Sequence, residues 1–238
     1  MAHAHLADTR ACPTARARHL GLVGLFLALV CSGCVGAQKS TADDPMPAGG
    51  LTANVEDKDA GLVALAKGFD VRQYPVIAVD RFPVTDKAVK DEDDRRLADS
   101  MSVFFQSELV RRLREGGQFR RVVNLGETEL QPGADRTLRL EGVITRLGQG
   151  SQVARAFFGA YGAGRARAQA DMRFIDVGSG QVVMVTADRR IAQTGYFGGD
   201  SKDHLKESFD DMARDLARFL GRLAKGEAPA TDAQRPAR

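Results

Sequence analysis

The sequence predicts an α+β fold, a two-layer sandwich in which two long amphipathic helices cover one face of a mixed or antiparallel sheet of about five strands. Two segments, 90–117 and 201–226, repeat apolar residues with the period of a helix that has one buried face. Short β-branched or alternating segments complete the order β-α-β-β-β-β-α. Because each helix has a single apolar face, packing both on one sheet buries them with the fewest elements.

The strands are predicted from residue type and alternation. The β-branched segment YPVIAVDRFPV is bounded by prolines and predicts a strand near 75–82. Further strands are predicted in FRRVVNLG and over 137–150. RARAQADMRFID, residues 165–176, alternates strictly, so its arginine, glutamine and aspartate side chains share one face, which we expect to point to water or to a partner. Residues 176–180 then turn the chain into a hairpin strand over 181–193.

Both helices show an apolar stripe and recognisable ends. The acidic residues 91–94 lie at the positive end of the first helix, and Gly116 and Gly117 end it. The acidic run lacks the ligand spacing and glycine of a calcium loop, so complementation of the helix dipole is the preferred interpretation. Gly226 occupies the C-cap position of the second helix. The stripes comprise Leu97, Met101, Phe104, Phe105, Leu109, Val110 and Leu113, then Leu205, Phe209, Met212, Leu216, Phe219 and Leu223.

Residues 1–33 are typical of a lipoprotein signal peptide. A polar stretch with three arginines precedes the apolar segment 20–30, which is shorter than the roughly 20 residues that span a bilayer as a helix. The small residues before Cys34 resemble the lipobox of bacterial lipoproteins, although Cys31 stands where leucine is common. This resemblance implies cleavage between Gly33 and Cys34 and acylation of Cys34. An ordinary signal peptide, cleaved nearby, is the alternative.

Lipidation predicts a location in the bacterial cell envelope. Cys34 would be the sole cysteine of the mature chain, so no internal disulfide could form, and acyl chains such as palmitate would bind it to the membrane. Val35 replaces the aspartate that favours retention in the inner membrane, which indicates the outer membrane, facing the periplasm. The mature chain is close to neutral, so we expect no nucleic-acid partner.

One domain is expected between two polar segments. Residues 34–66 are rich in alanine, glycine, aspartate and proline and have no apolar period, which predicts a flexible tether after the lipidated cysteine. Residues 227–238 have a similar composition and predict a disordered tail. The segment between them, 67–226, is long enough to bury a single core.

The segment ARAFFGAYGAGRARA, residues 154–168, has three competing interpretations. A phosphate-binding loop is disfavoured, because the glycine spacing is wrong and no crossover helix follows. A structural connection would use the glycines to turn tightly, with the aromatic rings over the open end of the sandwich. An interaction surface would use a small-residue face for close approach, or dip into the membrane between flanking arginines. The candidate interaction residues are Arg155, Phe157, Phe158, Gly159, Tyr161, Gly162 and Gly164.

The same region resembles a known family. An R-x-x-x-G-x-x-G-A-G pattern from Arg155 to Gly164, an alternating strand and the turn at 176–180 resemble a bacterial family catalogued as a domain of unknown function, four-four-one-zero. The resemblance covers about residues 70–225. It implies an exported lipoprotein and no particular reaction. The topology more distantly resembles the periplasmic domain of the curli-secretion channel lipoprotein.

The sequence contains no recognisable catalytic motif. His204 is the one histidine beyond the signal peptide, and we expect it to be a solvated residue in the first turn of a helix. We find no G-x-S-x-G or H-E-x-x-H pattern. The chain is therefore predicted to be a non-enzymatic envelope domain, without cofactor or metal, that binds another envelope component or itself. The alternatives are a subunit of an outer-membrane secretion or assembly complex, and a hydrolase or transferase whose carboxylates are assembled by the fold.

Overall fold

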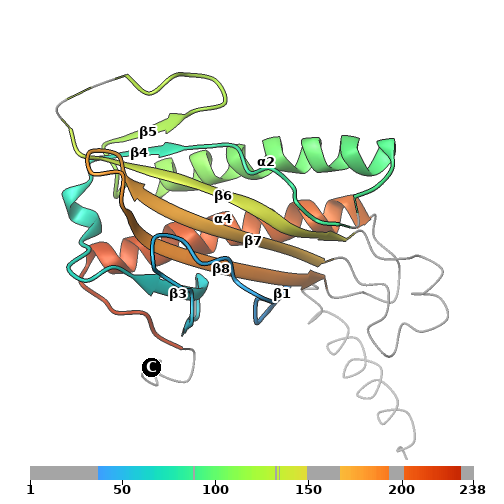
Figure 1. Cartoon of the computed structure of the whole chain (residues 1–238), viewed down its shortest axis with the longest axis horizontal. Helices are drawn as coiled ribbons and strands as arrows, with labels where there is room; N and C mark the ends of the chain where they lie inside the picture. The colour runs from blue at the N-terminus through green and yellow to red at the C-terminus, as the bar shows by residue number, and fades with distance from the viewer. Residues whose placement is uncertain are drawn as a thin grey trace, which may run out of the picture. The chain divides into compact units, whose positions relative to one another are not determined.

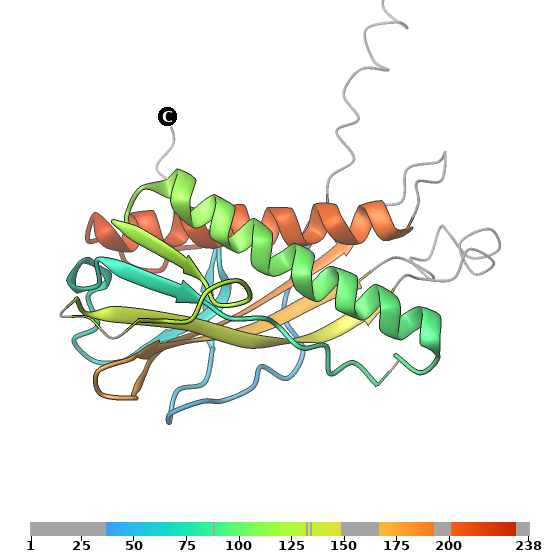
Figure 2. The same ribbon diagram turned by 90° about the horizontal axis from the view of Figure 1, so that it is seen from above.

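One sheet and two helices make up the described part of the chain, which in this computed structural model comprises residues 37–87, 89–131, 133, 135–148, 167–192 and 201–231. Both helices lie on the same face of the sheet (Figure 1; Figure 2). The elements are β1 (Ala37–Ser40), β2 (Val55–Asp57), β3 (Gly61–Leu65), the 3₁₀-helix η1 (Val71–Gln73), β4 (Val76–Val79), α2 (Glu92–Gly116), β5 (Arg121–Asn124), β6 (Thr137–Gly148), β7 (Arg167–Asp176), β8 (Val182–Ala192) and α4 (Ser201–Ala224).

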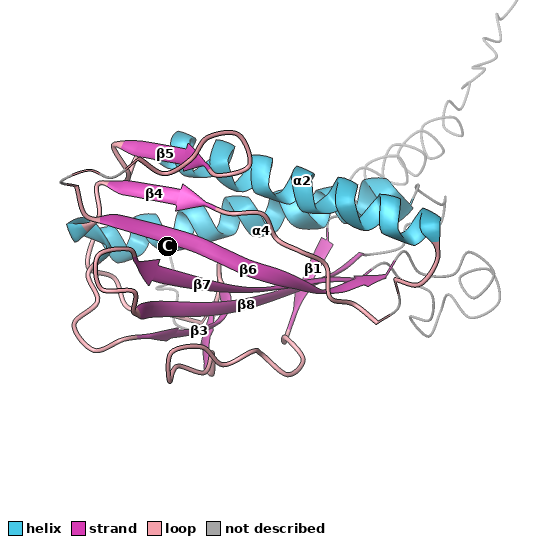
Figure 3. Cartoon of the chain, turned by 45° about the horizontal axis from the view of Figure 1, so that its top comes forward, coloured by secondary structure: helices cyan, strands magenta, loops and turns pink. Residues whose placement is uncertain are grey.

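The sheet is mixed, as the sequence predicted. Within the described residues its strand order is β2-β3-β8-β7-β6-β4-β5, and β1 also pairs with β8 (Figure 3). β4 runs parallel to β5 and β6, and the other pairs are antiparallel. Among the described residues from β4 onward, the element order is β-α-β-β-β-β-α, as the sequence predicted.

Helix α2 begins and ends at the residues that its sequence signals indicate. The side chain of Asp91 caps the helix by accepting a hydrogen bond from the backbone N–H of Asp94 at 2.8 Å. Three further acidic residues lie in its first turn, so the helix-dipole interpretation of this run is confirmed. At the other end Gly117 adopts a left-handed conformation with φ 68°, which suits glycine as a C-cap.

Three phenylalanines join the sheet to both helices. Phe82 follows β4, Phe105 lies on α2 and Phe209 lies on α4, and all three are fully buried. Their rings contact in sequence, with centroids 5.0 Å apart for Phe82 and Phe105 and 4.9 Å apart for Phe105 and Phe209. The predicted helical stripes therefore face the sheet and form the main core.

Residues 37–66 differ from our expectation of a flexible tether. They form β1, β2 and β3, and residues 41–54, hereafter the strap, cross the sheet face opposite the helices (Figure 2). Small apolar strap residues such as Ala42 and Ala53 pack with Val185 and Ala187 in a second, smaller core. Three strands in this stretch explain why the sheet has eight strands in the described residues, where the sequence predicted about five.

The strap also buries part of the β7 face that we expected to point to water. Gln169 is 0% exposed and Asp171 is 4% exposed. The Gln169 amide exchanges hydrogen bonds with the backbone of Asp43, at 2.9 and 2.8 Å, and Asp171 accepts one from the Met46 N–H at 3.0 Å. Among the residues of this face that the structure describes, Arg167 and Arg173 are exposed. Our expectation is wrong for the two central positions, because a distant segment supplies their partners.

The first residues of the predicted tail are also held by the domain. The Ala230 N–H donates to Asp57 Oδ2 at 2.9 Å, and the Ala230 carbonyl accepts from the Lys58 N–H at 2.8 Å. Both bonds lie at the end of the edge strand β2, one to the side chain of its last residue and one to the backbone of the next residue. We expected disorder from residue 227, but the chain is held by the domain as far as Ala230.

The closest backbone approach in the sheet generates a stability prediction. A Cβ added at Gly142 would meet the backbone oxygen of Asp171 and lie 2.9 Å from Met172 Cα. We expect Gly142→Ala to lower the free energy of unfolding by about 1–3 kcal/mol through overpacking, measured by urea denaturation. The control, Gly221→Ala in α4, has open space around its Cβ and should stabilise the protein by roughly 1 kcal/mol. Equal effects of the two substitutions would contradict the prediction.

Candidate functional site

Four strand ends meet at one end of the sheet. In the register of the sheet, Gly148 of β6 pairs with Arg167 of β7, and Arg167 pairs with Ile191 of β8. The next residue of β8, Ala192, pairs with Ala37, the first residue of β1. We call the group Ala37, Gly148, Arg167 and Ala192 the anchor end of the sheet. It lies side by side on neighbouring strands, so the chain segments that continue from it start close together.

Both candidate sites from the sequence attach to the anchor end. Cys34 stands three positions before Ala37 in the sequence. The glycine- and aromatic-rich stretch that contains residues 154–164, hereafter the Gly-aromatic segment, lies between Gly148 and Arg167 in the sequence. The structure does not describe Gly33, Cys34 or the loop candidates themselves, namely Arg155, Phe157, Phe158, Gly159, Tyr161, Gly162 and Gly164.

A buried ion network fixes the strands before η1 to α4. Arg222 lies between two buried carboxylates, with its Nη2 2.6 Å from Asp57 Oδ2 and its Nε 2.8 Å from Asp59 Oδ2. Arg218, one turn earlier on α4, lies 3.0 Å from Asp59 Oδ1. Burial opposes ionisation of Asp57, yet the hydrogen bonds from Arg222 and the backbone outweigh it and lower its pKa. The contacts tie the β2–β3 turn to the end of the last helix.

The network continues to β1 and β8. Arg190 Nη2 lies 2.7 Å from Asp188 Oδ2 and 2.8 Å from Asp215 Oδ2. Lys39 of β1 donates to the carbonyl of Lys58 at 2.8 Å, and burial lowers its pKa although the neighbouring carboxylates oppose this. Every carboxylate of the network has an arginine partner. The arrangement therefore holds structure together, and each of its buried carboxylates is neutralised by an arginine.

A smaller polar cluster lies at the opposite end of β7. Tyr74 donates its hydroxyl to Asp176 Oδ2 at 2.8 Å, and Arg136 contacts the same oxygen at 2.5 Å while stacking 4.6 Å above the Tyr74 ring. Burial opposes ionisation of Asp176, but these two hydrogen bonds lower its pKa to about 2. Burial and the bond to Asp176 raise the pKa of Tyr74 to about 12. Both groups are thus locked in one protonation state at neutral pH.

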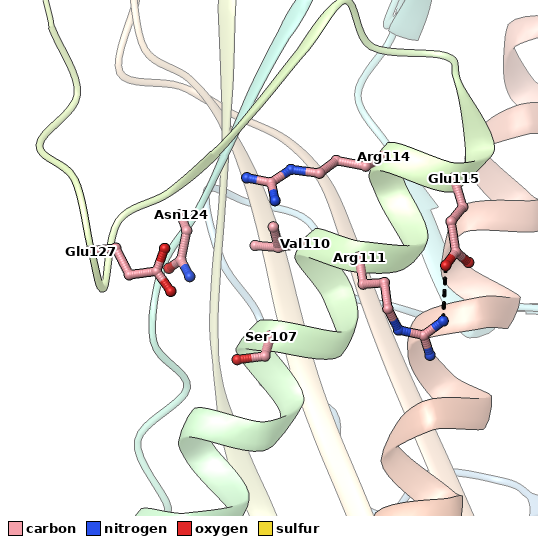
Figure 4. Close-up of a pocket in the computed structure, with 7 residues that line it drawn as sticks. All are labelled: Ser107, Val110, Arg111, Arg114, Glu115, Asn124 and Glu127. Carbon is pink, nitrogen blue, oxygen red and sulfur yellow. Dashed lines mark hydrogen bonds and ion pairs between the residues drawn. The ribbon is translucent and has the colours of Figure 1, made fainter.

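A cavity of about 300 Å³ lies between α2 and the edge strand β5 (Figure 4). Within it, Arg111 is held by Glu115 at 2.9 Å, and Arg114 reaches the carbonyl of Val122 at 3.3 Å. Asn124 Oδ1 accepts a bond from the Gly126 N–H at 2.9 Å. Arg114 thereby covers an outward-facing carbonyl of an edge strand, a position at which strands otherwise pair with other chains.

Other candidate groups have ordinary surroundings. His204 lies in the first turn of α4, 3.8 Å from Glu207 Oε2, and its side chain is 19% exposed. Among the described residues no group of three histidine, cysteine, aspartate or glutamate side chains is placed to hold a metal ion. Within the same residues no helix has the length and apolarity needed to cross a membrane.

Fold and site together define an α+β domain whose described buried charged groups are mostly paired and in which Ala37, Gly148, Arg167 and Ala192 lie at one end of the sheet. The chain belongs to the family described as Domain of unknown function (DUF4410), whose model matches residues 54–199. This confirms the family resemblance found in the sequence. A search of curated proteins returned no match.

Three solved structures show remote similarity. A PelC dodecamer from Paraburkholderia phytofirmans is 14% identical, with a TM-score of 0.41 over 65% of this chain and 98% of that one. A protein from Xanthomonas campestris is 10% identical, with a TM-score of 0.38 over 68% and 92%. A candidate lipoprotein from Caulobacter crescentus is 15% identical, with a TM-score of 0.30 over 67% and 96%. At these values none of them carries an argument about function.

The ion network predicts a large effect of removing one partner. Arg222→Ala would leave Asp57 buried without its cation, and we expect a loss of about 3–5 kcal/mol in the free energy of unfolding. Arg96→Ala, which breaks exposed ion pairs on α2, should cost less than about 1 kcal/mol. Urea denaturation at neutral pH measures both. A small effect at Arg222 would show that water or a neighbour replaces its charge.

The Asp176 cluster predicts a pH dependence. A carboxylate whose pKa falls on folding stabilises the native state above its unfolded pKa, and that contribution disappears as the pH falls through the folded value. The stability difference between the wild type and Asp176→Asn should therefore be constant above about pH 4 and shrink towards pH 2. Asp135→Asn, which breaks an exposed pair with Arg120, should change stability by less than about 1 kcal/mol throughout. A difference for Asp176→Asn that is independent of pH would contradict the assignment.

Proposed function

We propose that this chain is a non-enzymatic, lipid-anchored domain of the cell envelope that binds another envelope component, or a second copy of itself, at the anchor end of its sheet. The observation that carries the proposal is the register of β1, β6, β7 and β8, which brings Ala37, Gly148, Arg167 and Ala192 together. The acylated Cys34 and the Gly-aromatic segment would then share one end of the domain. A binding surface formed there would lie next to the membrane.

The short distance between Cys34 and β1 supports this arrangement. A long tether would let the domain rotate and sample the periplasm far from the lipid. Here only two residues, Val35 and Gly36, lie between Cys34 and Ala37, which would limit the reach to roughly 11 Å. The anchor end would therefore face the bilayer, and Phe157, Phe158 and Tyr161 would face the lipid head groups or a membrane-bound partner. The location that we propose is the periplasmic side of the outer membrane.

The pairing of the charged side chains supports a binding role over catalysis. Catalytic acids and bases are held with pKa values near the working pH. In the two charged clusters described above, arginine partners satisfy the carboxylates, and Asp176 and Tyr74 have pKa values far from neutrality. Such groups fix the fold without exchanging protons.

The test compares loop and control variants of the acylated full-length chain. We expect the triple substitution Phe157→Ser, Phe158→Ser and Tyr161→Ser to abolish self-association measured by light scattering, or to remove the envelope crosslinks that the wild type forms. Val177→Ser, which changes an exposed apolar residue at the opposite end of β7, is the matched control and should retain both. Cys34→Ala should release the chain from membranes.

Each outcome bears on a different part of the proposal. Unchanged mass by light scattering and unchanged envelope crosslinks in the triple variant would refute the role of the anchor end. Retention of Cys34→Ala in the membrane fraction would refute the lipid anchor. A closed ring that conducts ions across planar bilayers would favour the alternative of a secretion-complex subunit.

A further inference from the structure

A cavity of about 330 Å³ lies on the open face of the sheet, between the strap and strands β6 and β7. It is separate from the anchor end, and the inference below does not depend on the proposed function. Its walls come from the strap, the loop after β4 and the centre of both long strands. The lining residues are Met46, Pro47, Ala48, Asp80, Arg81, Pro83, Glu141, Gly142, Val143, Asp171, Met172 and Arg173.

Asp171 differs from the other buried aspartates of the domain. Among the described residues six aspartates are buried, and Asp57, Asp59, Asp176, Asp188 and Asp215 each lie within ion-pair distance of an arginine. Asp171 has no such partner in that part of the chain. Its donors among the described residues are both neutral, the Gln169 amide at 3.1 Å and the Met46 N–H at 3.0 Å.

The acids and bases around the cavity leave this charge uncompensated. Arg173 Nε lies 2.6 Å from Glu141 Oε1, and Arg139 pairs with Asp80, so those charges neutralise each other. Arg81 is exposed at the rim. A carboxylate that is removed from water without a cation is costly, and burial raises the pKa of Asp171, although the more distant charge of Arg146 opposes this.

The remaining wall suits a hydrocarbon stem. Val143 is the register partner of Asp171 and lies beside it on the open face. Met46, which is 50% exposed, and the rings of Pro47 and Pro83 supply further apolar surface. A flexible chain of methylenes that ends in a cation can lie along such a wall while its charge reaches the acid.

We propose that this cavity binds an alkyl cation, an alkylammonium or alkylguanidinium group, whose charge contacts Asp171 and whose stem lies along Met46, Pro83 and Val143. The same chemistry is supplied by a lysine or arginine side chain of another protein and by a free aliphatic amine. In either case the bound cation gives Asp171 the partner that every other buried aspartate of the described chain already has.

In the test, pentylammonium or pentylguanidinium is titrated into the full-length chain in detergent, and isothermal titration calorimetry measures the binding. Pentanol, which has the same stem without charge, is the control ligand. We expect both cations to bind and pentanol to bind at least tenfold more weakly, since a hydrogen bond to a charged group contributes roughly 1.5–3 kcal/mol. Equal binding of pentanol, or no binding of either cation, would overturn the proposal.

Two substitutions locate the charge. Asp171→Asn keeps the shape of the side chain and should weaken cation binding roughly tenfold or more. Arg81→Glu replaces an exposed cation at the rim by an anion, does not disturb the buried face, and should strengthen binding severalfold even if Asp171→Asn fails to fold. Unchanged affinity in Arg81→Glu, or in a folded Asp171→Asn, would place the ligand elsewhere and refute the site.

A peptide arm distinguishes the two sources of the cation. A short peptide with a central lysine, compared with the same peptide carrying norleucine, tests for a protein partner. If the lysine peptide binds more tightly than pentylammonium, the partner is a basic side chain. If the free amine binds more tightly, the site takes a small aliphatic amine.

Discussion

The guanidinium of Arg222, held between Asp57 and Asp59, is the contact on which the N-terminal part of the domain depends. Strands β2 and β3 are short, and most of their side chains are only partly buried, so apolar area alone fixes them weakly. The ion pairs between α4 and these strands supply the additional contacts that fix them in place. Lys39 and Arg190 extend the same network to β1 and β8. Since a buried charge without its partner is costly, the network specifies one position for these strands.

The docking of these strands determines which side chains are buried on the face of the sheet opposite the helices. Once β1 and β2 are fixed, the strap between them must cross β7, and its backbone groups satisfy Gln169 and Asp171. The crossing buries two polar side chains on a face that strand alternation alone would place in solvent. It also supplies one wall of the cavity that contains Asp171, and it brings the chain to Ala37 at the anchor end.

The parts of this structure that the sequence predicted are those with a local signal. Period and capping residues identified α2 and α4, and alternation or β-branching identified β4 to β8. The strands β1 to β3 carry sequences such as AQKS and VED, which resemble exposed segments. Asp57 is buried there against Arg222, which lies 165 positions later in the sequence. Cys34 and the Gly-aromatic segment were identified as candidates from sequence, but their attachment to one end of the sheet follows from the register of β1 on β8, which no local pattern encodes. The sequence did not predict the cavity at Asp171, because alternation along β7 predicts that this aspartate is exposed to solvent.

The strap links the two sites physically. Its first residue follows β1 directly, and three residues before β1 stands the cysteine that we propose to be acylated. In the middle of the strap, the Met46 N–H donates a hydrogen bond to the carboxylate of Asp171 at 3.0 Å. Earlier in the strap, Asp43 forms an ion pair with Arg189 at 2.5 Å. The cavity exists only while the strap is docked, because Met46, Pro47 and Ala48 form one of its walls. A ligand that requires this wall binds the docked state alone, and by linkage it stabilises the docked strap and the strand β1 that precedes it. Occupancy of the cavity and the docking of the strap and β1 are therefore thermodynamically coupled through one segment of chain.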